Sequence, residues 1–281
     1  MKSYSDVINN FLRLMPEVKT PTDLKPYVAH EFFKRLGERA KKNEKELKAS
    51  TIRTYFNKLI VFFKWLETNG LIEYKSLTSK ITKPPNPVYE DEKALHEEDV
   101  TKIVSAISLY NLEDEFMLKR DLVIVKILLY TGIRKGELLG LRIQDIDFSN
   151  KMMFVNGKTS KSKKSRYIPL HFSLLTELKF YLKMRESKNF KNEQLIVSTK
   201  KDEAYTEHGL KFWVNKYNKL SGVKFHLHQF RHTFACNLAK QGANIISIKN
   251  LLGHTTTQMT ERYLRSIKTE DARLHIDGLL Y

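Results

Sequence analysis

Three prolines stand within four residues, at Pro84, Pro85 and Pro87, and they constrain this chain of 281 residues more than any other local feature. Proline removes a backbone hydrogen-bond donor and fixes φ, so such a run interrupts helices and favours extended chain. We therefore place a linker at residues 83–93 and predict two domains, at residues 1–82 and 94–281. The chain is long enough for both to bury a core of their own.

The residues before the linker predict a small helical domain. Apolar residues recur at three- and four-residue spacing from about residue 49 to residue 68, which predicts an amphipathic helix that ends before Gly70. Shorter patterns at residues 8–12 and 32–36 predict two more helices. Arg53 and Lys58 fall largely off the apolar stripe, so they are candidates for phosphate contacts, although solvated surface positions suit them equally.

The residues after the linker predict a mixed domain that is mostly helical. A new helix is expected to begin near residues 94–100, and Gly132 and Gly253 are expected to end two others. Residues 152–155 and 166–169 predict two strands around a polar, basic hairpin loop, and residues 195–197 are a candidate third strand. The predicted fold class is therefore mainly α, with a helical N-terminal domain and a mixed α/β domain that carries a small antiparallel sheet.

The charge of the chain indicates a polyanionic partner. Lysine and arginine total 49 against 32 aspartate and glutamate residues, which gives a net charge of +17. The excess is shared by both predicted domains, so a partner that touches both fits better than a basic tail does; a generically basic soluble protein is the alternative. The single cysteine, Cys236, excludes an intrachain disulfide and fits a reducing cytoplasm.

Two arginines, two histidines and a late tyrosine form the chemical pattern of the second domain: Arg134, His228, Arg231, His254 and Tyr263. Attack on a phosphodiester requires cations at the non-bridging oxygens, a nucleophile, and an acid for the leaving oxygen. Forked guanidinium groups suit the first task. His228 and Arg231 would share one helix face. The pattern predicts DNA cleavage and rejoining through a phosphotyrosine.

The boxes around these residues resemble those of the tyrosine recombinases, also called the phage integrase family, and especially its Xer-type and mobile-element members. Residues 131–141, Thr-Gly-Ile-Arg-Lys-Gly-Glu-Leu-Leu-Gly-Leu, are similar to the family's first arginine box. Residues 228–235 are similar to its His-x-x-Arg box, and residues 251–254 together with Tyr263 to its last box. The resemblance covers residues 95–270 and extends more weakly to the first domain, where the helix at residues 50–66 is similar to a SAM-like core-binding domain.

The resemblance implies a role for each residue of the pattern. Tyr263 would be the nucleophile that forms a 3′-phosphotyrosine and releases a 5′-hydroxyl. Arg134 and Arg231 would hold the non-bridging oxygens of the phosphate. His228 would hydrogen-bond near the phosphate and help to move the tyrosine proton, and His254 would donate a hydrogen bond to the phosphate.

Further roles are implied for an acidic residue and for the hairpin lysines. Glu137 occupies the family's acidic support position. Lys158, directly after the first hairpin strand, is expected to be the general acid for the 5′-oxygen. Lys161, Lys163 and Lys164 are alternatives for that role, and are otherwise expected to contact backbone phosphates.

The resemblance also implies how the protein would work with its partners. The partner is double-stranded DNA, and a homotetramer on synapsed DNA would exchange strands through a Holliday junction. A second recombinase or an accessory protein is left open, and no cofactor, metal or ATP is expected. Residues 267–281 would dock on a neighbouring subunit or pack on their own domain. No arm-binding domain is expected before residues 1–84, so we expect a simple Xer-like system.

Three other readings compete with this one. A type IB topoisomerase shares the chemistry but not the Xer-like boxes. A regulator without catalysis would not need the complete set of residues. A zinc site is the third, formed from His226, His228, His232, Cys236 and His254, but no paired-cysteine motif accompanies these residues. The sequence leaves open whether the task is chromosome-dimer resolution or recombination of a phage, plasmid or transposon.

Overall fold

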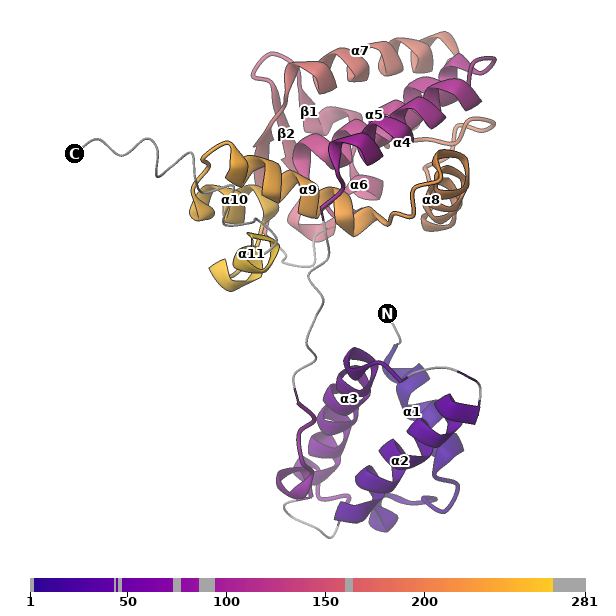
Figure 1. Ribbon diagram of the computed structural model, residues 1–281, viewed down its shortest axis with the longest axis vertical. Helices are drawn as coiled ribbons and strands as arrows, with labels where there is room; N and C mark the ends of the chain where they lie inside the picture. The colour runs from indigo at the N-terminus through magenta and orange to yellow at the C-terminus, as the bar shows by residue number, and fades with distance from the viewer. Residues whose placement is uncertain are drawn as a thin grey trace, which may run out of the picture. The chain divides into compact units, whose positions relative to one another are not determined.

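The computed structural model of this protein describes residues 3–42, 44, 47–72, 77–85, 94–159 and 164–264. The chain divides into two compact units, Met1–Glu90 and Asp91–Tyr281 (Figure 1). Each unit has its own hydrophobic core. Among the helices described, none is both long enough and apolar enough to cross a membrane.

The described residues of the first unit contain three α-helices, α1 (Tyr4–Leu14), α2 (Pro26–Lys42) and α3 (Ala49–Thr68). Short 3-10 turns follow α1 and α3, at Pro21–Asp23 and Thr78–Lys80. One phenylalanine from each helix meets in the core, where the ring of Phe11 lies 5.2 Å from that of Phe32 and 5.6 Å from that of Phe63. The helix predicted at residues 49–68 is α3, because its apolar stripe is the side that faces this core.

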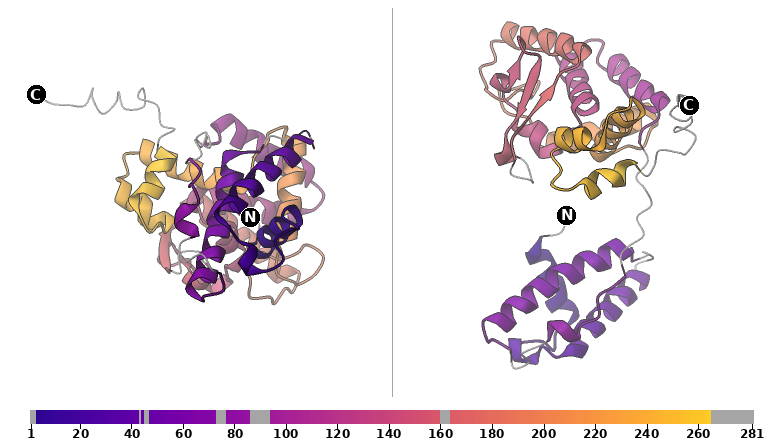
Figure 2. Two further views of the ribbon diagram at one scale, coloured as in Figure 1. Left: turned by 90° about the horizontal axis from the view of Figure 1, so that it is seen from below. Right: turned by 90° about the vertical axis from the view of Figure 1, so that its left-hand side faces the viewer.

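The second unit contains eight α-helices within its described residues: α4 (Glu97–Tyr110), α5 (Glu115–Thr131), α6 (Lys135–Gly140), α7 (Phe172–Ser187), α8 (Glu207–Ser221), α9 (Leu227–Lys240), α10 (Ile245–Leu252) and α11 (Thr257–Leu264). Helix α5 is its centre, with residues 123–125 and 127–128 all buried. A helix that is apolar on most sides belongs inside a core. It packs against α4, α7 and α9 (Figures 1 and 2).

A three-stranded antiparallel sheet lies beside these helices, in the order β1 (Ile146–Asp147), β2 (Met152–Val155) and β3 (Arg166–Pro169). Met153 pairs with Ile168, and both side chains are buried. Helix α10 packs against β3 (Figure 2). One 3-10 turn, Ile143–Asp145, precedes β1, and another, Gly157–Thr159, follows β2. The predicted class, mainly α with a small antiparallel sheet, is confirmed.

The prediction of a third strand at residues 195–197 was wrong. The third strand is β1, whereas Gln194 and Val197 form only isolated bridges, to Arg142 and Ala204. A short apolar run fits a buried strand and a buried connection equally well, and residues 195–197 are buried core residues. The two residues of β1 are too few to give a period.

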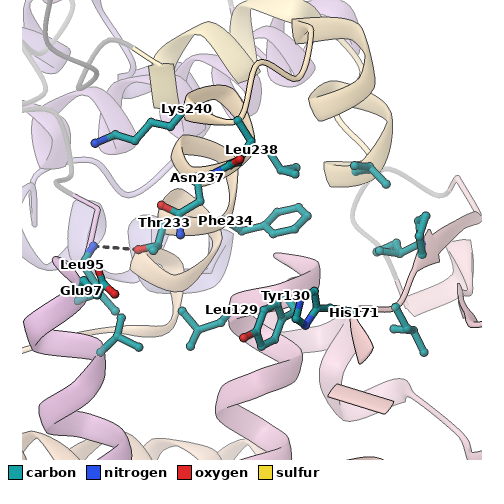
Figure 3. A pocket seen from close by; sticks show the side chains of 16 residues that line it. Leu95, Glu97, Leu129, Tyr130, His171, Thr233, Phe234, Asn237, Leu238 and Lys240 are labelled. Carbon is teal, nitrogen blue, oxygen red and sulfur yellow. Dashed lines mark hydrogen bonds between the residues drawn. The ribbon is translucent and has the colours of Figure 1, made fainter. Parts of the chain in front are cut away.

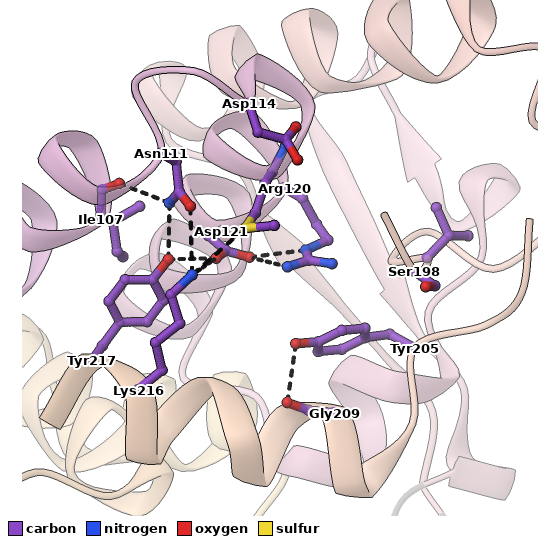
Figure 4. A network of polar contacts seen from close by, with 12 residues as sticks. Ile107, Asn111, Asp114, Arg120, Asp121, Ser198, Tyr205, Gly209, Lys216 and Tyr217 are labelled. Atoms are coloured by element: carbon purple, nitrogen blue, oxygen red, sulfur yellow. Dashed lines mark hydrogen bonds and ion pairs between the residues drawn. The ribbon is translucent and has the colours of Figure 1, made fainter. Parts of the chain in front are cut away.

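A buried polar network ties α4, α5 and α8 together (Figure 4). Asp121 of α5 is fully buried and accepts hydrogen bonds from Arg120 Nε at 2.8 Å and from the Tyr217 hydroxyl at 2.6 Å. Asn111 Nδ2 donates to the same hydroxyl at 2.9 Å. Lys216 Nζ lies 3.9 Å from the Asp121 carboxylate. Each buried polar group of this set therefore has a partner within the protein.

Candidate active site

A left-handed glycine places Arg134 at the start of α6. Gly132 ends α5 with φ of +58°, and a Cβ at this position would lie 2.5 Å from Cδ1 of Phe234. A side chain is thus excluded both by the backbone angle and by space. Arg134 is the N-cap residue of α6, and its backbone N–H donates to Glu137 Oε2 at 2.8 Å. The abrupt change from α5 to α6 therefore requires the glycine, and it places Arg134 at the start of α6.

Glu137 is buried between two arginines. Its carboxylate accepts from Arg134 Nη1 at 3.2 Å, and from Arg166 Nη1 at 3.1 Å and Nη2 at 2.9 Å. The Glu137 side chain has no exposed surface, whereas that of Arg134 is 22% exposed. Arg134 therefore keeps one face toward solvent while the carboxylate holds it from behind.

Sequence reasoning missed Arg166. It is the first residue of β3, and its side chain is buried against Glu137 and the Leu251 carbonyl, to which Nε donates at 2.6 Å. In the sequence it is one basic residue among several around the hairpin, and nothing local separates it from those lysines. The only signal was its place at the start of a predicted strand, where a charged residue that faces inward needs a buried partner.

Arg231 belongs to α9, and its buried side chain reaches the C-terminal end of α10. Its Nη1 donates to the Gly132 carbonyl at 2.7 Å, and its Nη2 to the Leu252 carbonyl at 2.6 Å. Its Nε has no hydrogen-bond partner among the residues that the structure describes. Burial, together with the nearby Arg134 guanidinium, lowers the pKa of Arg231 to about 10, so the group is still charged at neutral pH.

His254 follows the left-handed Gly253, as the sequence predicted. Helix α10 ends at Leu252, and the Gly253 φ of +65° turns the chain so that His254 becomes buried. Its Nδ1 lies 2.8 Å from the Thr260 hydroxyl. Burial first, and then the charges of Arg231 and Arg134, lower the pKa of His254 to about 3. The ring is therefore neutral across the physiological range.

Tyr263 lies on α11 within a cage of imidazole rings. Its hydroxyl is 3.0 Å from Nε2 of His228, which lies on α9. Its ring stacks on that of His254 at 5.4 Å between centroids with an angle of 9°, and lies 5.1 Å from the ring of His232. The Sγ of Cys236 donates to the Tyr263 carbonyl at 3.2 Å, which fixes the helix that carries the phenol. Tyr263 is 9% exposed.

The structure describes two of the hairpin lysines, Lys158 and Lys164. Lys158 is exposed in the turn after β2, and no hydrogen bond or ion pair joins its ammonium to the cluster within the described parts of the chain. It lines a polar pocket together with residues of the sheet such as Tyr167. Lys164 is exposed, and Lys161 and Lys163 lie outside the described residues.

The two basic residues named in the first unit are engaged within that unit. Arg53 Nη1 donates to the Pro84 carbonyl. The ammonium of Lys58 lies 5.0 Å above the ring of Tyr4. Both side chains are half-buried, so each keeps some surface that faces solvent. Their contact with DNA stays a prediction.

No cluster of three or more residues suited to hold a metal occurs among the described histidine, cysteine, aspartate and glutamate side chains. Of the residues weighed for zinc, Cys236 is buried, with Sγ 3.4 Å from Nδ1 of His232. His228 and His254 face Tyr263 from two sides. Three of the histidines, His228, His232 and His254, thus lie around the phenol of Tyr263.

A mostly apolar cavity of about 900 Å³ lies beside the site but contains none of the predicted site residues (Figure 3). Its walls come from α4, α5, α9 and the connection between β3 and α7. The Tyr130 ring stacks on His171 there, with ring centroids 4.6 Å apart. At another part of the cavity wall, the Leu95 N–H donates to the Thr233 hydroxyl at 2.8 Å.

Comparisons with known proteins fix the family. Residues 93–270 match the family described as "Phage integrase family". The chain is 30% identical to the tyrosine recombinase XerC of Thermodesulfovibrio yellowstonii (strain ATCC 51303 / DSM 11347 / YP87) over 264 residues, which are 90% of this chain and 80% of the relative.

Two solved structures show the same fold. The XerH site-specific recombinase bound to its difH substrate matches with a TM-score of 0.68 at 21% identity, over 96% of this chain and 77% of that chain. The Tn1549 transposon integrase in complex with transposon right end DNA matches with a TM-score of 0.71 at 22% identity, over 99% and 94%. The chain therefore belongs to the phage integrase family and is a Xer-like tyrosine recombinase, a site-specific recombination enzyme that acts on DNA.

Proposed function

We propose that Tyr263 attacks the scissile phosphate of duplex DNA. A bond forms between the phenol oxygen and phosphorus, the bond to the 5′-oxygen breaks, and the DNA is left as a 3′-phosphotyrosine. The observation that carries the proposal is the 3.0 Å contact between the Tyr263 hydroxyl and Nε2 of His228, because a nucleophile needs a base within hydrogen-bond reach. His228 takes the phenol proton in this step.

The arginines would supply the positive charge. Arg134 Nη1 and Arg231 Nη2 both approach the Leu252 carbonyl, at 3.5 Å and 2.6 Å, so the two guanidiniums converge at the end of α10. Each keeps N–H groups that no acceptor among the described residues uses, Arg231 Nε among them. Forked donors fixed before the substrate arrives suit the non-bridging oxygens of the transition state.

His254 and Lys158 would complete the chemistry. With Nδ1 of His254 at the Thr260 hydroxyl, the neutral ring has Nε2 left to donate to the phosphate. Lys158 would then protonate the 5′-oxygen as it leaves. This last role needs the turn after β2 to approach the phosphate, and Lys161, Lys163 and Lys164 remain alternatives for it.

Residues 1–82 would form the core-binding domain, joined by the linker at residues 83–93 to a catalytic domain at residues 94–281. Arg53 and Lys58 would contact DNA phosphates from the first domain, and the spare hairpin lysines from the second. We further propose a homotetramer on synapsed DNA in the cytoplasm, with strands exchanged through a Holliday junction. No cofactor, metal or ATP is needed, because arginines supply the charge and the phosphotyrosine conserves the energy of the broken bond.

Replacing Tyr263 by phenylalanine tests the proposal. The change removes one hydroxyl and keeps the ring that packs on His254, so duplex affinity should match wild type while the covalent protein–DNA adduct is lost. The two proteins are incubated in EDTA with nicked suicide duplexes tiled from the DNA that flanks the gene, and adducts are read on a denaturing gel. An adduct formed by the Tyr263→Phe protein would contradict the proposal.

A further inference from the structure

Arg166 joins three parts of the active site that are far apart in the sequence. It begins β3, the second strand of the lysine hairpin. Its Nη1 and Nη2 form a two-point contact with the Glu137 carboxylate of α6, at 3.1 Å and 2.9 Å. Its Nε donates to the Leu251 carbonyl in the last turn of α10, at 2.6 Å. The side chain is 8% exposed, so the three contacts are shielded from water.

The contact with Glu137 bears on Arg134. One carboxylate serves both guanidiniums, since Glu137 Oε1 accepts from Arg134 Nη1 at 3.2 Å and from Arg166 Nη1 at 3.1 Å. A bidentate arginine fixes the plane of a carboxylate, which a single hydrogen bond does not. Arg166, together with the Arg134 backbone N–H that donates to Oε2, therefore sets the direction in which Glu137 presents Oε1 to Arg134.

The contact with α10 bears on Arg231 and His254. The Leu251 carbonyl that Arg166 holds is followed by the Leu252 carbonyl, which accepts from Arg231, and then by the turn into His254. Gly253 fits closely against the same guanidinium: a Cβ there would lie 2.9 Å from Arg166 Nη1 and 3.1 Å from Cζ. The turn at Gly253 thus packs directly against the Arg166 guanidinium.

We infer that Arg166 is a positioning residue for strand cleavage, which orients Arg134 through Glu137 and fixes the turn that carries His254 and the acceptor of Arg231. We assign it no contact with the phosphate, because each of its three guanidinium nitrogens already donates within the protein, whereas the Nε of Arg231 does not. The inference rests on the proposed function for the reaction that is positioned.

The test measures cleavage and stability separately in Arg166→Lys and Arg166→Gln. Lysine keeps the charge but cannot make the two-point contact, so it shows whether geometry matters. The single-turnover rate of adduct formation per folded molecule, at saturating suicide duplex, should fall by roughly 100-fold in both variants, the usual scale for a small misplacement of catalytic groups. Duplex affinity should stay near that of wild type.

A matched control separates positioning from general loss of stability. Arg185 is also a buried arginine that donates to backbone carbonyls, Leu195 O at 2.8 Å among them, and it makes no contact with the site. Arg185→Lys should lower the thermal midpoint while the folded protein cleaves at the wild-type rate. If Arg166→Lys cleaves at the wild-type rate too, the inference is wrong.

A double-mutant cycle tests the route through Glu137. If Arg166 orients Arg134 through this carboxylate, Glu137→Gln will slow cleavage, and adding Arg166→Gln to it will slow cleavage by less than Arg166→Gln does alone. If the fold-losses in cleavage rate of the two single variants simply multiply in the double variant, Arg166 does not act through Glu137.

Inorganic phosphate provides a readout that does not depend on cleavage. Phosphate is titrated into each full-length protein and followed by the NMR shifts of the His254 ring. Affinity should be lower in Arg166→Gln than in wild type and unchanged in Arg185→Lys. If wild type forms no adduct on any duplex, the proposed function fails while this titration still decides the inference; equal affinities, or no phosphate binding by either protein, would overturn it.

Discussion

Two buried carboxylates of the second unit, Asp121 and Glu137, both pair with arginine, but their surroundings differ. Asp121 lies in a closed network in which Arg120, Tyr217 and Asn111 bond to one another or to the carboxylate. Glu137 lies in an open one. Three arginines gather around it and α10, yet no other carboxylate accepts from them among the described residues.

The difference shows in the electrostatics of each region. In the open cluster the pKa of His254 falls to about 3, because burial and then the charges of Arg231 and Arg134 disfavour a further positive charge. In the closed network the pKa of Tyr217 is raised, by burial and by the neighbouring Asp121. Among the described residues, a single carboxylate lies among three arginines in the first region, whereas in the second region Asp121 pairs with Arg120 and lies 3.9 Å from Lys216. We therefore expect changes at Asp121 to affect stability and changes around Glu137 to affect cleavage.

Asp121→Asn should have the largest effect on the free energy of unfolding. It leaves the buried Arg120 without its carboxylate, and breaking a buried pair by removing one partner costs about 3–5 kcal/mol. Denaturant unfolding measures the loss, and the protein that remains folded should cleave at the wild-type rate. The control is Glu193→Gln, which breaks an exposed pair with Arg142 and should cost less than about 1 kcal/mol.

Arg134→Lys should have the next largest effect, and on cleavage alone. The side chain is 22% exposed and Glu137 keeps Arg166, so stability changes little. The rate of adduct formation should fall by about 100- to 1,000-fold, as when one donor to a developing charge is lost. A fall in stability comparable to that of Asp121→Asn, with cleavage preserved, would reverse the comparison.

Gly253→Ala should lower both the stability and the rate of cleavage, each to a smaller degree. A left-handed φ costs an alanine about 1–2 kcal/mol, and its Cβ would press on Arg166. Thermal unfolding and single-turnover cleavage measured on the same samples should both decline. Gly222→Ala, also at positive φ but in open space, gives the cost of the backbone angle alone.

The last effect is absent at neutral pH and develops only in acid. Because folding lowers the pKa of His254 from 6.5 to about 3, its contribution to stability is fully present above pH 6.5. It is lost as the pH falls from there toward 3, since the unfolded chain binds a proton that the folded chain excludes, at up to about 1.4 kcal/mol per pH unit. Chemical unfolding at several pH values should show a shallower slope in His254→Gln. Equal slopes would mean that His254 titrates normally.

The sequence predicted the parts of this molecule that depend on local pattern. Helix α3 and strands β2 and β3 have the predicted bounds, because alternation and helical spacing directly reflect which side chains face the core. Left-handed glycines explain why the site residues could be placed in turns as well. Gly132 ends its helix two residues before Arg134, and Gly253 ends its helix directly before His254.

Features that depend on distant partners escaped prediction. Arg166 looks like any basic residue of the hairpin until β3 brings it to a carboxylate 29 residues away. Asp121 lies within an apolar helix, and its partner Tyr217 is 96 residues further along the chain. Strand β1 has only two residues, too few to show a period. The sequence pattern therefore favours the buried run at residues 195–197 as the third strand.

The most direct test of the central claim is to identify the residue that becomes joined to DNA. The adduct formed in EDTA on a nicked suicide duplex is digested with trypsin, and the peptide that carries nucleotide is sequenced by mass spectrometry. We predict a nucleotide attached through its 3′-phosphate to Tyr263, with a free 5′-hydroxyl on the released strand. Attachment to another residue, or a 5′-phosphate on the released strand, would contradict the account.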